Sequence, residues 1–174
     1  MIPWLENDSP FPDPASAMRQ PNGLLAAGAD LSPHRLLTAY RRGIFPWYND
    51  GEPILWWSPD PRFVLFPDEL QVSKSMKSLL KKEAFQFTTN KAFEQVIGQC
   101  KKVKREGQRG TWITNDMLEA YQLLHQQGLA QSAEAWQDGE LVGGLYGIRM
   151  GRLFFGESMF STRRDRKSTR LNSS

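Results

Sequence analysis

The 174-residue sequence has one cysteine, two histidines and no long hydrophobic run. A single cysteine, Cys100, excludes an internal disulfide and favours a reducing compartment. With the distant His34 and His125 it offers too few ligands for a zinc site. No stretch reaches the roughly 18 apolar residues of a membrane span, and the opening MIPWLENDSPFPDP lacks the features of a secretory signal. The sequence therefore predicts a cytoplasmic protein without membrane attachment.

Signatures of common enzyme classes are also missing. There is no GxxxxGK[ST] loop, which argues against a phosphate-cradling nucleotide site, and no Ser/His/Asp arrangement can be argued. Gly143, Gly144 and Gly147 lie within a strand-like run, where glycines indicate bulges or close backbone approach. Cys100 falls on an apolar helix face, which favours a buried structural thiol over a nucleophile.

The net charge of +3 depends on the last residues, RRDRKSTRLNSS, from 163 to 174. Without them the chain has 17 basic and 18 acidic residues. Because the last ten residues look like a translated sequencing adapter, we expect residues 163–174 to be an artefactual tail on a truncated reading frame. The alternative is a basic tail that contacts nucleic acid.

A second basic region lies inside the chain, between Lys74 and Arg109, where ten basic residues face three acidic ones. A positive face on a near-neutral body suits a polyanion that docks at one place. Two well-solvated helices with lysine-rich faces are the alternative.

Local patterns predict an α+β protein, with helices followed by an antiparallel meander. Residues 1–31 are expected to be coil. Ser32, Ser73 and Asn90 are expected to cap helices, and Asp138-Gly139 indicates a hairpin. The expected helices run over 33–42, 74–82, 91–102 and 115–127, with strands at 62–66, 85–89, 132–137, 140–150 and 152–160. The expected inward residues are Leu36, Leu37, Tyr40, Met76, Leu79, Leu80, Phe93, Val96, Ile97, Cys100, Met117, Leu118, Tyr121 and Leu124.

The stretch GIFPWYNDGEPILWWSPDPR, residues 43–62, holds three tryptophans among four prolines. Proline breaks helices and interior strands, so this stretch cannot be one regular element. Rings on a stiff backbone can stack on unpaired bases. Trp47, beside Pro46, favours this surface role, whereas packing into the core is the stronger alternative for Trp56 and Trp57.

Glu157 is a carboxylate within the apolar run FFGESMF. Burial there is costly unless the carboxylate is paired. The partner is an amine in a functional reading, and a backbone cap or an arginine in a structural one. The residues alone do not decide between these.

Several of these segments occur together, in order and without large gaps, from about Pro21 to Ser161. The combination of IFPW, ILWWSPDPR, GTWIT, ELVGGLYGI and GESMFS resembles the leucyl/phenylalanyl-tRNA–protein transferase family. The resemblance implies a small N-terminal lobe, residues 1–62, followed by an incomplete GNAT-like lobe, residues 63–162. It also implies transfer of leucine or phenylalanine from aminoacyl-tRNA to the N-terminal arginine or lysine of acceptor proteins, which marks them for degradation in the bacterial cytosol.

The resemblance assigns roles to particular residues. Trp47 and Trp112 match the aromatics that hold the nucleotide end, and Leu145, Gly156 and Met159 match an apolar pocket. Glu157 would orient an amine. Leu145 stands where relatives often carry methionine. The expected phosphate contacts are Lys74, Lys77, Lys81, Lys82, Lys101, Lys102, Lys104 and Arg105. No metal or cofactor is implied, because the aminoacyl ester is already activated.

The family continues beyond Ser161 and carries there an Asp-x-Gln pair proposed for proton transfer and substrate positioning. The sequence has no such pair, so we expect this chain to be inactive. Two rival functions remain: a non-catalytic RNA-binding module, and a GNAT acyltransferase that uses acyl-CoA.

Overall fold

The structure is a computed structural model that describes residues 2–103 and 113–162. The chain forms two compact units. The first, called the N-terminal unit, contains Met1–Phe63 and Lys101–Leu129, and the second, called the sheet unit, contains Val64–Cys100 and Ala130–Ser174. The expected lobes of residues 1–62 and 63–162 stay a prediction.

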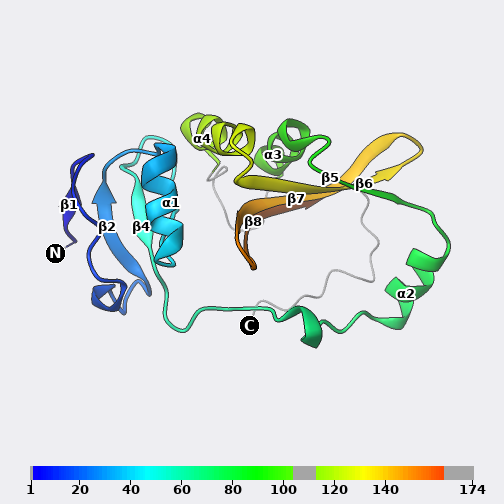
Figure 1. Cartoon of the computed structure of the whole chain (residues 1–174), viewed down its shortest axis with the longest axis horizontal. Helices are drawn as coiled ribbons and strands as arrows, with labels where there is room; N and C mark the ends of the chain where they lie inside the picture. The colour runs from blue at the N-terminus through cyan, green and yellow to red at the C-terminus, as the bar shows by residue number, and fades with distance from the viewer. Residues whose placement is uncertain (1, 104–112, 163–174) are drawn as a thin grey trace. The chain divides into compact units, whose positions relative to one another are not determined.

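The N-terminal unit contains a four-stranded sheet in the order β1-β2-β4-β3. Its strands are β1 (Trp4–Leu5), β2 (Leu24–Gly28), β3 (Phe45–Pro46) and β4 (Leu55–Trp57) (Figure 1). The prediction of coil over 1–31 is wrong for β1, for β2 and for a short 3₁₀ helix, Pro14–Ser16. All five residues of β2 are buried, so the strand lacks the apolar–polar alternation that identifies a half-exposed strand. The Trp/Pro stretch forms two short strands and not one regular element, as predicted.

Helix α1 (Pro33–Arg41) begins as its sequence predicts. The Ser32 hydroxyl accepts a hydrogen bond from the Arg35 N–H at 3.3 Å, which satisfies one free donor of the first turn. The chain leaves the helix through Gly43, whose positive φ of 72° suits glycine. Leu36 and Tyr40 are buried as expected, while Leu37 is only partly covered.

Helix α4 (Asn115–Gln126) belongs to the same unit and begins at the Thr114 cap. Its buried face contains Met117, Tyr121 and Leu124, as predicted, whereas Leu118 is only partly covered. The hydroxyl groups of Tyr40 on α1 and Tyr121 on α4 lie 2.5 Å apart in the core. This contact joins segments that are 81 residues apart in the sequence.

The sheet unit contains β5 (Gln86–Thr89), β6 (Ala130–Gln137), β7 (Glu140–Met150) and β8 (Leu153–Ser161). They form an antiparallel sheet in sequence order, which confirms the meander and the α+β class. Asp138 and Gly139 both have positive φ, 54° and 80°, as the tight turn of a two-residue hairpin requires.

Helix α3 (Phe93–Lys102) buries Phe93, Val96, Ile97 and Cys100, as its spacing predicts. The expected cap at Asn90 is wrong. The Asn90 side chain instead accepts a hydrogen bond from the Ser132 N–H at 2.9 Å. The Ala92 N–H, at the start of α3, donates to the carboxylate of Glu134 on β6 at 3.4 Å. A partner distant in sequence has thus replaced the local cap.

Two further expectations, for the strand at 62–66 and for the inward side chains of 74–82, are wrong. Residues 62–66 form no strand, and Phe63 is 97% exposed. No described strand pairs with this segment, and prolines flank it at Pro61 and Pro67. A short 3₁₀ helix, Pro67–Glu69, follows.

Helix α2 (Lys74–Lys81) has the predicted Ser73 cap, but its apolar side chains are not buried. Met76 and Leu80 are exposed, and Leu79 is only partly covered, so the expected inward face is not formed. None of the helices described here is both long and apolar enough to cross a bilayer.

Candidate functional site

The two faces of the β5–β8 sheet differ in what covers them. Helix α3 covers one face (Figure 1). There the rings of Phe93 on α3 and Tyr146 on β7 meet edge to face at 5.8 Å. Tyr146 and Ile148 are fully buried there. The opposite face carries the residues that alternate with these along the strands. They include Leu145, which is half-buried, and Met159, which is 63% exposed. We call this second surface the open face.

Strand β8 carries a β-bulge at Glu157. Tyr146 pairs with Ser158 and Gly147 pairs with Gly156, so Glu157 is the extra residue between them. Bulges re-aim side chains and recur beside active sites. Glu157 is half-buried and is engaged with neighbouring groups. Its placement therefore depends on the register of two strands and not on its own strand alone.

Gly147 makes this bulge possible. A Cβ atom at residue 147 would lie 2.1 Å from the Phe155 carbonyl oxygen and 2.7 Å from Cζ of Phe154. Only glycine fits so close to a backbone oxygen. The Phe154 ring therefore lies against Gly147, and its Cε1 is 3.8 Å from where a Cβ of Gly156 would lie.

The structure brings four predicted site residues together on β7 and β8. Leu145 is directly opposite Met159 in the strand register, and Gly156 and Glu157 follow at the bulge. Phe154, 49% exposed, is a neighbour that the sequence analysis missed. Its signal was the aromatic pair FF directly before Gly156, in a strand whose alternate residues face opposite sides.

Trp47 lies in the N-terminal unit and is 43% exposed. Its ring centroid is 5.5 Å from that of Trp57, and the Trp57 indole N–H donates to the Trp47 carbonyl oxygen at 2.7 Å. Trp56 is fully buried and donates to the Gly28 carbonyl oxygen at 2.9 Å. The core role is thus confirmed for Trp56, whereas the stacking role of Trp47 stays a prediction.

Tyr48 is a second residue that the sequence analysis missed. Its hydroxyl lies 3.2 Å from the Thr114 hydroxyl, at the cap of α4. Burial raises the pKa of Tyr48; the bond to Thr114 opposes this effect, and Asp116 and Asp50 add to it. The contact fixes the backbone beside Trp47 to the start of α4. An aromatic residue beside Trp47 in IFPWY was the available signal.

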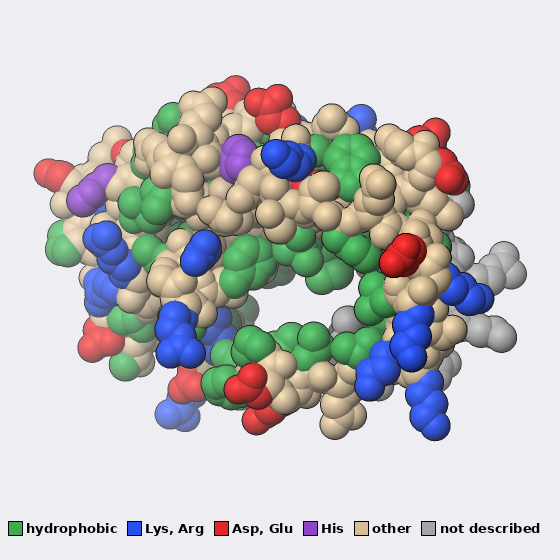
Figure 2. Space-filling model, turned by 45° about the vertical axis from the view of Figure 1, so that its right-hand side comes forward, with side chains coloured by type: hydrophobic (Ala, Val, Ile, Leu, Met, Phe, Trp, Pro, Cys, Tyr) green, Lys and Arg blue, Asp and Glu red, His purple; other side chains and the backbone are tan. Residues whose placement is uncertain are grey.

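The expected phosphate-binding residues fall in both units. Lys74, Lys77, Lys81 and Lys82 are exposed at α2 in the sheet unit. Figure 2 shows Lys and Arg side chains in several separate groups on the visible surface. Lys101 and Lys102 belong to the N-terminal unit, where the Lys101 ammonium donates to the Asn115 amide oxygen. Lys104, Arg105 and Trp112 lie outside the described residues.

The described residues hold no cluster of three or more His, Cys, Asp or Glu side chains able to bind a metal ion. Cys100 is buried and is not positioned as an exposed nucleophile.

Comparisons with known proteins cover both units. The family model described as leucyl/phenylalanyl-tRNA protein transferase matches residues 64–171, and the model of that family's N-terminal domain matches residues 29–60. A leucyl/phenylalanyl-tRNA–protein transferase of Nitrosospira multiformis is 59% identical over 161 residues, which cover 92% of this chain and 69% of that protein.

Two further relatives with the same name agree. The Nitrosomonas europaea protein is 58% identical over 95% of this chain and 70% of its own length. The Flavobacterium johnsoniae protein is 59% identical over 91% of this chain and 74% of its own length. The chain belongs to the leucyl/phenylalanyl-tRNA–protein transferase family of enzymes.

Proposed function

We propose that this chain represents an aminoacyltransferase that moves leucine or phenylalanine from aminoacyl-tRNA to the N-terminal arginine or lysine of acceptor proteins. Such tagging would mark the acceptors for degradation in the cytoplasm. The observation that carries the proposal is the bulge at Glu157, beside the apolar side chains of Leu145, Phe154 and Met159. Family membership supports the same reaction.

The chemistry requires positioning more than activation. An aminoacyl ester reacts with an amine without a metal or a covalent intermediate, and holding two reactants in line can supply much of the acceleration. The open face offers an apolar surface for a leucine or phenylalanine side chain. Glu157 offers a carboxylate that can accept a hydrogen bond from an amine.

Two other features would bind the tRNA. An exposed indole such as Trp47 can stack on the terminal adenosine, which is worth about 1–3 kcal/mol. The lysines of α2 are exposed and can bind phosphates in a salt-dependent manner. We include Lys104, Arg105 and Trp112 in this proposal from the sequence alone.

The proposal distinguishes the family's activity from that of this chain. The sequence contains no Asp-x-Gln pair, which supports the expectation that residues 1–174 alone do not catalyse transfer. The lobes of residues 1–62 and 63–162, and the artefactual nature of residues 163–174, belong to the same proposal.

The test is transfer of labelled leucine from leucyl-tRNA to a peptide that begins with arginine. One protein is the chain as given. The second is residues 1–161 extended with the C-terminal part of the Nitrosospira multiformis relative. We expect transfer by the extended protein only. Glu157→Gln should lower this transfer, while Glu140→Gln, an exposed carboxyl in the β6–β7 hairpin, should not.

Other outcomes would favour the rival functions. Transfer that requires an acyl-CoA donor would support a GNAT acyltransferase. Binding of tRNA by the extended protein, without any transfer, would support an RNA-binding module. Transfer by the chain as given would contradict the expected inactivity.

A further inference from the structure

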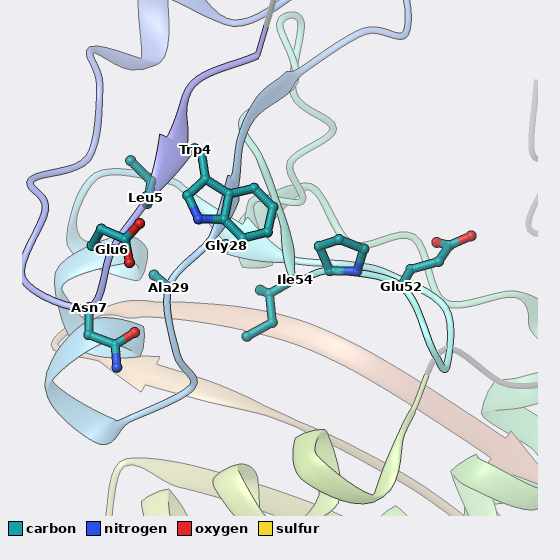
Figure 3. Close-up of a pocket in the computed structure, with 9 residues that line it drawn as sticks. Trp4, Leu5, Glu6, Asn7, Gly28, Ala29, Glu52 and Ile54 are labelled. Carbon is teal, nitrogen blue, oxygen red and sulfur yellow. The ribbon is translucent and has the colours of Figure 1, made fainter.

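A pocket of about 380 Å³ lies in the N-terminal unit, and none of its lining residues has been assigned a role above. Its walls come from β1, from the end of β2 and from the turn before β4 (Figure 3). The residues that matter for its chemistry are Trp4, Glu6, Asn7, Gly28, Glu52 and Ile54.

The pocket has an aromatic wall. Trp4 is 61% exposed, although it is paired with Ala27 through the backbone of β1 and β2. Its indole lies across Gly28: a Cβ at residue 28 would be 3.0 Å from the indole Cε2. Figure 3 shows this ring with Ile54 near it. An exposed tryptophan face beside an apolar side chain attracts a cation that has an aliphatic stem.

The charged groups of the pocket are all acidic. Its lining contains Glu6 and Glu52 and no lysine or arginine. Figure 3 shows the Glu6 carboxylate on the side of the indole, whereas the Glu52 side chain extends from the far rim and away from Trp4. The Glu52 carboxylate accepts hydrogen bonds from Asn49. Glu6 is therefore the nearer partner for a bound cation, and Glu52 contributes at longer range.

The Arg35 side chain holds the loop that carries Glu6. The Arg35 guanidinium, which is buried, donates to the carbonyl oxygens of Glu6 at 3.1 Å, of Ser9 at 2.6 Å and of Asn7. It also lies 4.9 Å from the centre of the Phe11 ring. Its charge is thus engaged by the backbone, and it orders the loop without occupying the pocket. The side chains of Glu6 and Asn7 make no hydrogen bond or ion pair with any described residue.

The excess of acidic residues near the start of the chain agrees with a cation-binding site at this place. Residues 1–31 contain four acidic residues and one arginine. We infer that the Trp4–Glu6 pocket binds a basic side chain, an arginine guanidinium or a lysine ammonium, of the acceptor polypeptide. This inference rests on the proposed function, because it assigns a binding site to the basic acceptor. Planar guanidinium stacks well on an indole and pairs with a carboxylate.

The experiment measures binding without the transfer reaction. The chain as given is titrated against a fluorescein-labelled, arginine-containing peptide, and fluorescence anisotropy is recorded without tRNA. The matched ligand replaces arginine by citrulline, which keeps the shape and removes the charge. We expect citrulline to weaken binding about fivefold to tenfold. We expect Trp4→Leu and Glu6→Gln each to weaken arginine binding about twofold to fivefold, and Glu52→Gln to have a smaller effect.

Controls separate a local contact from a change of net charge or of folding. The double variant Glu69→Gln/Glu140→Gln removes two exposed carboxyls of the sheet unit and should leave arginine binding unchanged. Circular dichroism should show each pocket variant folded. Equal binding of both peptides, or arginine binding unchanged in Trp4→Leu and Glu6→Gln, would overturn the inference.

The binding and transfer experiments together distinguish failure of the pocket inference from failure of the proposed function. If arginine binding depends on Trp4 and Glu6 but the extended protein transfers no leucine, the proposed function fails and the basic-side-chain site stands. If the extended protein transfers leucine while the pocket variants bind arginine normally, the site fails and the function stands.

Discussion

The two faces of the β5–β8 sheet come from the same strands, whose successive side chains point alternately to one face and to the other. Phe160 is buried on the α3 face, and its neighbour Met159 is 63% exposed on the open face. A Cβ at Gly144 would lie 2.9 Å from Val96 of α3 and 3.0 Å from the Phe160 ring, so the α3 face is closely packed. The open face instead carries Leu145 and Met159, two residues of the candidate site. Packing fixes one face, and exposure leaves the other available for a ligand.

The largest expected effect contrasts these two neighbours. Phe160→Ala should lower the free energy of unfolding by about 3–5 kcal/mol, because it opens a cavity in a buried cluster. Met159→Ala should change it by less than about 1 kcal/mol, because most of that side chain is already in water. Urea unfolding monitored by circular dichroism measures both. Equal costs would mean that the open face is covered in solution, and the comparison would fail.

The bulge supplies the second contrast. Gly147→Ala should cost about 1–3 kcal/mol, since the new methyl group would overlap the Phe155 carbonyl oxygen and the Phe154 ring. Gly156→Ala is the matched control on the opposite strand, where the nearest atom would be at an ordinary 3.8 Å. Thermal unfolding compares the two variants. A Gly156→Ala variant as unstable as Gly147→Ala would contradict the described register.

Local signals in the sequence predicted the elements that depend on short-range contacts. The caps at Ser32 and Ser73 formed as expected, and so did the Asp138-Gly139 turn with its two strands. Helix α3 buries the four residues that its spacing selected. In each case the deciding atoms lie within a few residues of one another, so a pattern in the sequence is enough.

The features that the sequence patterns did not predict depend on partners that are distant in the sequence. Asn90 has the residue type of a cap, but Ser132 and Gln131 bind its side chain. The segment 62–66 has strand-forming residues and no strand beside it among the described residues. Leu145, Gly156 and Met159 came from a family resemblance, whereas Glu157 was also singled out as a carboxylate within an apolar run. The bulge that arranges them follows from inter-strand register, which the sequence alone does not specify.

The α3 face also holds a buried charge, which gives the third prediction. Glu134 accepts hydrogen bonds from the hydroxyls of Ser132 and Thr88, both at 2.5 Å, and from the Ala92 N–H. Burial by itself raises the pKa of Glu134, but these bonds together with one from the Lys91 backbone outweigh it and leave the pKa below its ordinary value. Glu134→Gln should therefore lower the free energy of unfolding at pH 7 by about 1–3 kcal/mol.

The pH dependence follows from the direction of that shift. A carboxyl whose folded pKa is lowered stabilises the fold above its unfolded pKa, about 4.3, and loses this contribution as pH falls through the folded pKa. The difference in stability between wild type and Glu134→Gln should shrink below about pH 4. Urea midpoints at a series of pH values measure it. A difference that stays constant from pH 7 to pH 3 would show that Glu134 contributes through packing and not through its charge. Glu140→Gln, exposed on the hairpin, serves as control.

The smallest expected effect compares the two faces by placing a methionine on each of them. Leu145→Met, on the open face, conserves volume and should change the free energy of unfolding by less than about 0.5 kcal/mol. Ile148→Met, on the α3 face, replaces a fully buried branched side chain and should cost more, up to about 1.5 kcal/mol. In the extended protein, Leu145→Met should also alter the ratio of leucine to phenylalanine transferred, because its side chain lies opposite Met159. An unchanged ratio, with Ile148→Met altering it instead, would move the selective surface to the α3 side of the sheet.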